Sequence, residues 1–161
     1  MRYTPFLVLL FVVLGCGNST KVATGSNTPP ANSYPAKRFT INQTKTFSGL
    51  SVTVGEIAFE TGKITVGVTL RNDTKDTLTA YPDQGQLVEG KHQVEANLIM
   101  TNGDLSGDIH SGVEKAGSIA FIDNEHLVEP SGDITLMLGK VFTPRLNSTE
   151  IKFPLTLVSS Q

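Results

Sequence analysis

Apolar residues recur at every second position through most of the chain after residue 38, and this period constrains the fold more than any other feature. The clearest run places Ile64, Val66, Val68 and Leu70 on one face, with polar residues or glycine between them. Similar runs cover residues 92–98, 134–138 and 151–157, so that Leu98 is expected on a buried face. A period of two is typical of strands with one buried side. No segment has a convincing helical period, and the chain is therefore predicted to be all-β.

The boundaries of these runs carry further information. In residues 50–59 the apolar phase passes through 50, 52 and 54 and then moves to 57 and 59. Such a slip at Gly55 predicts a β-bulge that turns the strand and keeps its buried face. Turn sequences separate the runs, as at 61–62, 72–73, 89–90, 102–103 and 131–132. About seven or eight short strands joined in this way predict an immunoglobulin-like antiparallel β-sandwich over residues 39–161.

The first 16 residues have a different character. A basic Arg2 precedes an unbroken apolar run at 6–14, which ends at Gly15 and Cys16. Nine residues fall far short of the ~20 that span a bilayer, and the pattern predicts a secretory signal at 1–15. Residues 13–16, Val-Leu-Gly-Cys, resemble the lipobox of bacterial lipoproteins. The resemblance implies cleavage before Cys16, acylation of that residue by palmitate-like chains, and a lipid anchor on the extracytoplasmic side, at the outer surface or in the periplasm. A secreted protein with a free Cys16 is the alternative.

Residues 17–38 read as a tether between this anchor and the domain. Gly, Ser, Thr, Asn and Pro supply 14 of the 22 positions, a composition that cannot bury enough surface to offset its ordering entropy. As a flexible coil the segment reaches roughly 25 Å. The tether carries +3 and no acid, whereas residues 39–161 hold nine basic residues and all 15 acids, for a net charge of −6. An acidic domain gives no support to nucleic-acid binding.

Three segments of the domain each combine a strand with a characteristic turn. Residues 66–72 form a strand that ends in Asn before a turn, residues 87–92 form an acidic-Gly-Lys hairpin, and residues 112–121 carry two glycines five positions apart before a strand that ends in Phe. Together they resemble bacterial lipoproteins with an immunoglobulin-like domain of the DUF4352, or MPT63-like, type. That resemblance implies an extracytoplasmic sandwich of unassigned biochemical role. It supplies no catalytic residues.

The polar segment 102–110 is the strongest candidate for a metal loop. Asn102, Asp104, Ser106 and Asp108 place oxygen atoms at alternate positions, with glycine in the sixth. A calcium loop of this kind usually has Glu at the twelfth position, where this chain has Val113, and Glu114 follows one residue late. A polar loop with glycine turns explains the pattern, and calcium remains the alternative. The three histidines, His92, His110 and His126, lack metal-motif spacing, so no metal and no cofactor are expected.

Catalytic motifs are equally weak. Residues 85–92 approach a phosphate-binding loop, but His92 replaces the Ser or Thr after Lys91, and an alternating strand follows in place of a helix. No Ser lies in a G-x-S-x-G or S-x-x-K motif, and the single Cys lies at the expected anchor. The sequence therefore favours a non-enzymatic protein. An envelope hydrolase with a carboxylate or metal site and an inhibitor of an envelope enzyme remain the alternatives.

These observations predict a membrane-anchored module that binds another protein through strand edges or end loops, which are the usual binding surfaces of such folds. The expected contact region comprises the loops 81–86 and 101–114. Its named candidates are Tyr81, Asp83, Gln84, Asp104, Asp108 and His110. The identity of the partner protein is not expected to follow from the sequence.

Overall fold

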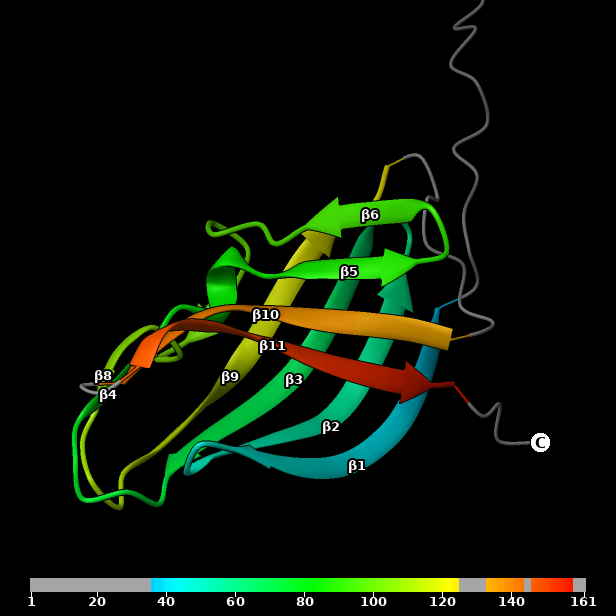
Figure 1. Cartoon of the computed structure of the whole chain (residues 1–161). Helices are drawn as coiled ribbons and strands as arrows, with labels where there is room; N and C mark the ends of the chain where they lie inside the picture. The colour runs from blue at the N-terminus through cyan, green and yellow to red at the C-terminus, as the bar shows by residue number, and fades with distance from the viewer. Residues whose placement is uncertain (1–35, 125–132, 144–145, 158–161) are drawn as a thin grey trace, which may run out of the picture. The chain divides into compact units, whose positions relative to one another are not determined.

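Two antiparallel β-sheets lie face to face and enclose the apolar residues between them (Figure 1). The computed structural model describes residues 36–124, 133–143 and 146–157. The expected signal at 1–15, Cys16, most of the 16–38 segment, His126 and the turn at 131–132 lie outside the described residues. The all-β sandwich predicted from the alternating pattern is confirmed. Its first strand begins at Lys37, two residues before the expected start of the domain.

The first sheet contains the longest run of sequential strands. Its order is β1-β2-β3-β9-β7, and every neighbouring pair is antiparallel. The bounds are β1 Lys37–Phe47, β2 Leu50–Glu60, β3 Lys63–Asn72, β9 Glu114–Ile122 and β7 Asn102–Gly103. The periodic run that contains Ile64 and Leu70 forms the centre of this sheet.

The second sheet has the order β6-β5-β10-β4-β8, with β11 paired to the other edge of β10. Its bounds are β4 Leu78–Ala80, β5 Gln86–Glu89, β6 His92–Glu95, β8 Gly107–Ile109, β10 Asp133–Thr143 and β11 Leu146–Thr156, with the 3-10 turn η1 at Pro82–Gln84. The described residues hold eleven strands, more than the seven or eight expected. Five of them have four residues or fewer, too short for a period of two to become visible.

The slip in the apolar phase at Gly55 is a β-bulge, as predicted. Val54 is opposite Val68 and Ile57 is opposite Val66, so β2 carries one residue more than β3 between these pairs. Both Val54 and Ile57 remain fully buried. The bulge therefore returns the apolar side chains of β2 to the buried face after the slip, and none of them becomes exposed at this point.

Aromatic and branched side chains from both sheets fill the space between them. Phe59, Phe121 and Phe153 are the largest fully buried side chains, and the ring of Phe39 packs edge-on against Phe59 at 5.8 Å. Burial of each such side chain contributes roughly 1.5–3 kcal/mol, so this shared core stabilises the sandwich. Among the described residues, η1 is the only helical element, and no helix there is long and apolar enough to cross a membrane.

A buried asparagine closes one end of the sandwich. The Asn72 amide nitrogen donates to the carbonyl oxygens of Asp76 and Ile109, both at 2.8 Å. Its amide oxygen accepts from the backbone nitrogen of Thr74 at 2.9 Å and from the Thr74 hydroxyl at 2.7 Å. The backbone of Asn72 bonds to Gly112 and Val113. Asn72 thereby joins the loop after β3 to the loop before β9.

Candidate functional site

The loop that contains Tyr81, Asp83 and Gln84 lies along the edge of β10 that also pairs with β4 and β5. The backbone nitrogen of Tyr81 donates to the carbonyl oxygen of Lys140 at 3.0 Å, and η1 follows at once because Pro82 fixes its first dihedral angle. The Tyr81 ring meets the half-exposed Phe142 ring edge-on at 6.1 Å. Two aromatic side chains, one just before η1 and one in β10, thus lie together at the surface of the second sheet.

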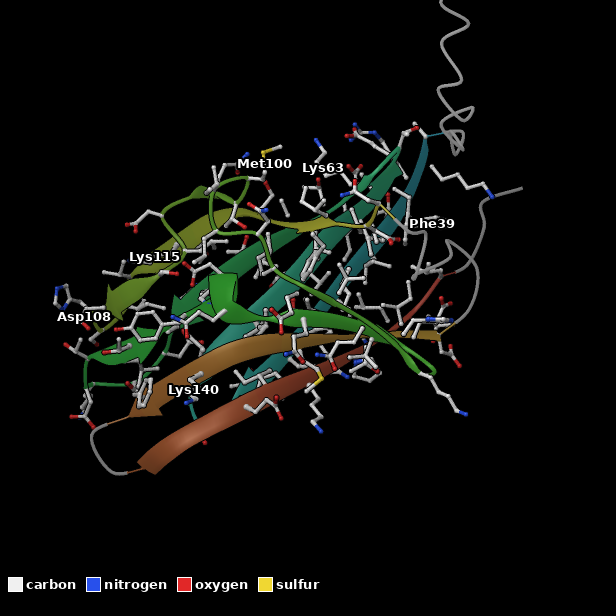
Figure 2. The ribbon with its side chains drawn as sticks, turned by 90° about the horizontal axis from the view of Figure 1, so that it is seen from above. Phe39, Lys63, Met100, Asp108, Lys115 and Lys140 are labelled. Carbon is white, nitrogen blue, oxygen red and sulfur yellow. The ribbon has the colours of Figure 1, made fainter. Side chains whose placement is uncertain are left out.

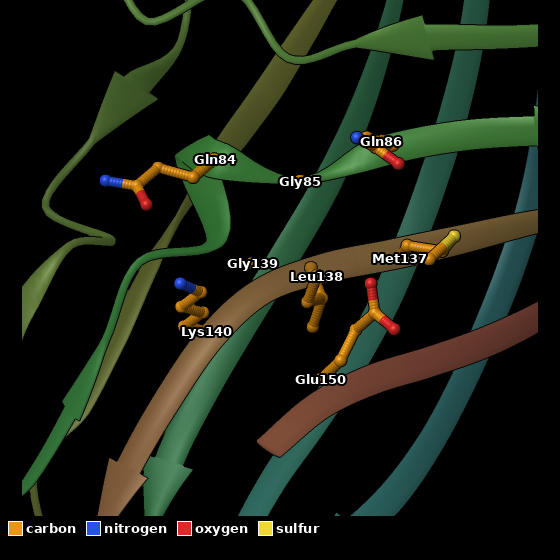
Figure 3. A pocket seen from close by; sticks show the side chains of 8 residues that line it. All are labelled: Gln84, Gly85, Gln86, Met137, Leu138, Gly139, Lys140 and Glu150. Carbon is orange, nitrogen blue, oxygen red and sulfur yellow. The ribbon is translucent and has the colours of Figure 1, made fainter. Parts of the chain in front are cut away.

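A groove of about 270 Å³ is lined by residues of η1, β5, β10 and β11 (Figure 3). It lies where η1 approaches β10, and the approach depends on two glycines. A β-carbon on Gly139 would collide with the carbonyl oxygen of Tyr81, and one on Gly85 would collide with that of Met137. Figure 3 shows Lys140 and Glu150 on either side of the groove floor at Leu138 and Gly139. The groove therefore presents charges of both signs around an apolar floor.

Asp83 is only half buried, but its Oδ1 atom is shielded from solvent and has no hydrogen-bond partner among the described residues. Gln84, in contrast, is exposed and lines the groove. Of the three residues predicted in this loop, Tyr81 and Gln84 are available to a partner at the surface, while Asp83 turns one carboxylate oxygen inward.

The structure separates the polar residues of the second predicted loop. The Lys115 Nζ atom lies 2.9 Å from Asp104 Oδ1, the Thr79 hydroxyl donates to Asp108 at 2.6 Å, and His110 Nδ1 bonds to the Thr77 hydroxyl at 3.1 Å. Glu114 lies in β9 opposite Arg71. Asp104, Asp108 and His110 thus bind three different protein partners, whereas the Ser106 hydroxyl is buried without one in the part of the chain that the structure describes. The described residues hold no group of three that could bind a metal ion. The loop connects β7 in the first sheet to β8 in the second.

The segment between β6 and β7 departs from the sequence prediction. Leu98 was expected on a buried face, but it is 61% exposed, and its neighbours Ile99 and Met100 are 92% and 50% exposed. The expectation is wrong because β6 ends at Glu95, where the chain leaves the second sheet for the first: Ala96 bridges to Phe121, and the Asn97 nitrogen donates to the Ala120 carbonyl oxygen at 2.7 Å. The sequence carries one signal for this exposure. Leu98, Ile99 and Met100 are three consecutive apolar residues, whereas a strand with one buried face alternates apolar and polar residues.

We call residues 97–101 the apolar turn. Asn97 organises it: its Oδ1 atom accepts from the backbone nitrogens of Ile99 and Met100 at 3.1 and 3.0 Å. The backbone of Thr101 closes the turn on the Asn97 carbonyl oxygen at 3.0 Å, and the Thr101 hydroxyl accepts from the backbone nitrogen of Ala120 at 3.1 Å. The exposed apolar side chains therefore stand on a fixed backbone. Figure 2 shows Met100 at the margin of the molecule.

The long outer strands are poorly suited to binding an added strand. In β1, a bulge between Thr40 and Gln43 breaks the ladder, and Asn42 has a φ of 46°. In β11, Pro154 has no backbone hydrogen to donate. Bulges and prolines on outer strands are common protections against edge-to-edge pairing. These two strand edges therefore carry features that oppose pairing with an added strand.

No family model and no curated protein matches the chain. Solved structures do match its fold. A functionally unknown protein from Listeria monocytogenes EGD-e aligns with a TM-score of 0.57 at 13% identity, over 80% of this chain and 89% of that one. The yjhA protein from Bacillus subtilis aligns with a TM-score of 0.52 at 15% identity, over 74% of this chain and 99% of that one.

A conserved hypothetical protein from Bacillus anthracis also aligns, with a TM-score of 0.50 at 13% identity over 64% of this chain and 91% of that one. The chain thus shares its β-rich fold with bacterial proteins that are themselves uncharacterised. At these identities the likeness extends to the fold alone, and it assigns no role to the groove or to the apolar turn.

Proposed function

We propose that this protein is a lipid-anchored, extracytoplasmic, non-catalytic module that binds another protein through the loop surface around η1. The observation that carries the proposal is the groove between η1 and β10, together with the aromatic pair of Tyr81, which precedes η1, and Phe142, which belongs to β10. Aromatic side chains are enriched in the cores of protein interfaces. Gln84, Lys140 and Glu150 add polar groups of both signs at the rim.

The anchor is proposed from Cys16 and the residues around it. A two- or three-chain lipid attachment holds a protein stably at a membrane, whereas one acyl chain holds it only marginally. In the sequence, 20 residues separate Cys16 from Lys37, where the first strand begins. The chain needs no membrane-spanning helix for this arrangement.

The interaction surface is tested by photo-crosslinking in cells. A photoreactive amino acid is placed at Gln84 or at Lys140, and the matched control carries it at Thr44, an exposed position on β1 in the other sheet. We expect a discrete protein adduct from Gln84 and Lys140 and none from Thr44. Equal labelling from all three positions, or no protein adduct from the groove, contradicts the proposed surface.

The anchor is tested separately with Cys16→Ala. We expect wild-type protein to fractionate with membranes and to carry acyl chains by mass spectrometry, and the variant to be released. A Cys16→Ala protein that remains fully membrane-bound disproves the lipid anchor and leaves the groove to be judged by crosslinking alone.

A further inference from the structure

The apolar turn exposes three adjacent aliphatic side chains without any charge between them. From 96 to 103 the sequence is Ala-Asn-Leu-Ile-Met-Thr-Asn-Gly, flanked by the acids Glu95 and Asp104. Single exposed apolar residues are normal on proteins, but a contiguous group on a fixed backbone is typical of an interaction site. Since Asn97 already orders the turn, little conformational entropy remains to be lost when the side chains are covered.

The apolar turn lies at the same level of the sheet as the point where the chain enters the fold. Ala96, which precedes the turn, is opposite Phe121, and the same row continues through Ile64 and Phe59 to Lys37. Four strand spacings separate the two ends of this row, roughly 19 Å. A flexible coil of 20 residues, the number that separates Cys16 from Lys37 in the sequence, has an end-to-end distance of about 25 Å. An anchor at Cys16 therefore keeps this level of the domain within reach of the bilayer.

The charged side chains along this part of the first sheet balance one another. Arg38 pairs with Glu56 at 2.7 Å and lies 3.6 Å from Glu60, whose other oxygen lies 2.9 Å from Lys63. Two basic and two acidic groups thus form one network, although the domain as a whole is acidic. Figure 2 shows Lys63 and Met100 along the same margin of the molecule. No net charge of this network opposes contact with uncharged lipid.

From this geometry we infer that Leu98, Ile99 and Met100 enter the surface of the lipid bilayer that carries the Cys16 anchor and so orient the domain on it. The inference rests on the proposed function, because three aliphatic side chains bind a bilayer weakly by themselves. A tether changes this, since a short linker raises the effective concentration of the second contact to the millimolar range. Protein hot spots, by comparison, favour Trp, Tyr and Arg, and the turn contains none of these.

The lack of tryptophan in the chain provides a direct test. Ile99→Trp places a single indole on the apolar turn, and the control Val113→Trp places one at a 40% exposed position beside the opposite end of β9. Each full-length acylated variant is reconstituted into phosphatidylcholine vesicles, and flotation with the vesicles is measured first. We expect both variants to float.

Emission is then recorded in vesicles with ordinary or brominated acyl chains, which quench an indole that touches them. We expect the emission of Ile99→Trp to move to shorter wavelength and to be largely quenched, and that of Val113→Trp to be unchanged. Equal behaviour of two floating variants overturns the inference and leaves the anchor intact. Failure of both to float overturns the anchor and, with it, the inference. A protein adduct from a photoreactive residue at position 99 in cells also overturns it, and favours an inhibitor that inserts this turn into a partner.

Discussion

Two asparagines organise two loops of this sandwich, with opposite results for the apolar residues beside them. Asn72 is fully buried, and its hydrogen bonds hold the loop between β3 and β4 against the loop between β8 and β9, where Ile109 and Leu78 are covered completely. Asn97 also bonds to the backbone of its own loop, but Ile99 beside it remains 92% exposed.

The difference shows that a fixed loop backbone does not by itself decide whether an apolar side chain is buried. Around Asn72 the hydrogen bonds connect segments 37 residues apart, so the loops cover the end of the core. Around Asn97 they connect neighbours within one turn and attach that turn to β9. The first arrangement covers apolar side chains, whereas the second leaves them exposed.

The largest expected effect on stability distinguishes two isoleucines, Ile109 at the end of β8 and Ile99 in the apolar turn. Ile109→Ala removes a fully buried side chain and should lower the free energy of unfolding by about 3 kcal/mol, because it leaves a cavity. Ile99→Ala should change it by no more than about 0.5 kcal/mol. Urea unfolding followed by circular dichroism measures both. A comparable loss for Ile99→Ala would mean that the turn packs against the domain.

The second effect concerns the polar centre of the buried loop. Asn72→Ala removes two donors and an acceptor and leaves buried backbone groups unsatisfied, at a cost of about 2–3 kcal/mol. Asn102→Ala is the control, since Asn102 is exposed and bonds only to the Ser118 hydroxyl among the interactions of its side chain in the described residues. We expect less than about 0.5 kcal/mol for the control. If the two variants unfold at the same urea concentration, Asn72 does not hold the loops together.

The third effect is on the apolar turn itself. Asn97→Ala removes the acceptor for the Ile99 and Met100 nitrogens and should lower stability by about 1 kcal/mol, as loss of a capping side chain does. Hydrogen exchange at those two amides should become faster. Asn97→Asp keeps an acceptor oxygen and should preserve most of their protection, so that slow exchange in Asn97→Ala would contradict the role assigned to this side chain.

The smallest effect belongs to the ion pairs on the first sheet. The hydrogen bond from Lys63 to Glu60, then the charge of Lys63 and that of Arg38, lower the pKa of the Glu60 carboxyl, against a small opposing effect of burial. A lowered folded-state pKa stabilises the protein above the unfolded-state pKa, and this contribution disappears as the pH falls through the folded-state pKa. Both side chains are about one-third exposed.

Lys63→Gln should therefore lower the free energy of unfolding at pH 7 by only a few tenths of a kcal/mol, since solvent screens an exposed pair. The loss should vanish at a pH where Glu60 is protonated. Nuclear magnetic resonance titration of Glu60 should show its pKa rising toward the usual value in the variant. A Glu60 pKa that does not respond to Lys63→Gln would show that the pair is not formed in solution.

The sequence by itself determined the features that depend on near neighbours in the chain. The alternation from Ile64 to Leu70 predicted a strand with one buried face, the slip at Gly55 predicted the bulge, and Gly90 with Lys91 predicted the hairpin between β5 and β6. Each follows from the geometry of a single strand or turn, in which side-chain direction has a period of two.

Only the tertiary structure decided where strands end and which side chains meet. Leu98 continues the alternation of β6, but pairing of Ala96 with Phe121, 25 residues later, takes the chain to the other sheet and leaves Leu98 in the apolar turn. Asp104, Asp108 and His110 follow a metal-like spacing, yet their partners lie in different places. Asp104 pairs with Lys115 in β9, Asp108 accepts from Thr79 in β4, and His110 bonds to Thr77 just before β4. Whether a side chain is buried, and which group it bonds to, depends on residues distant in the sequence. A local sequence pattern therefore cannot predict either.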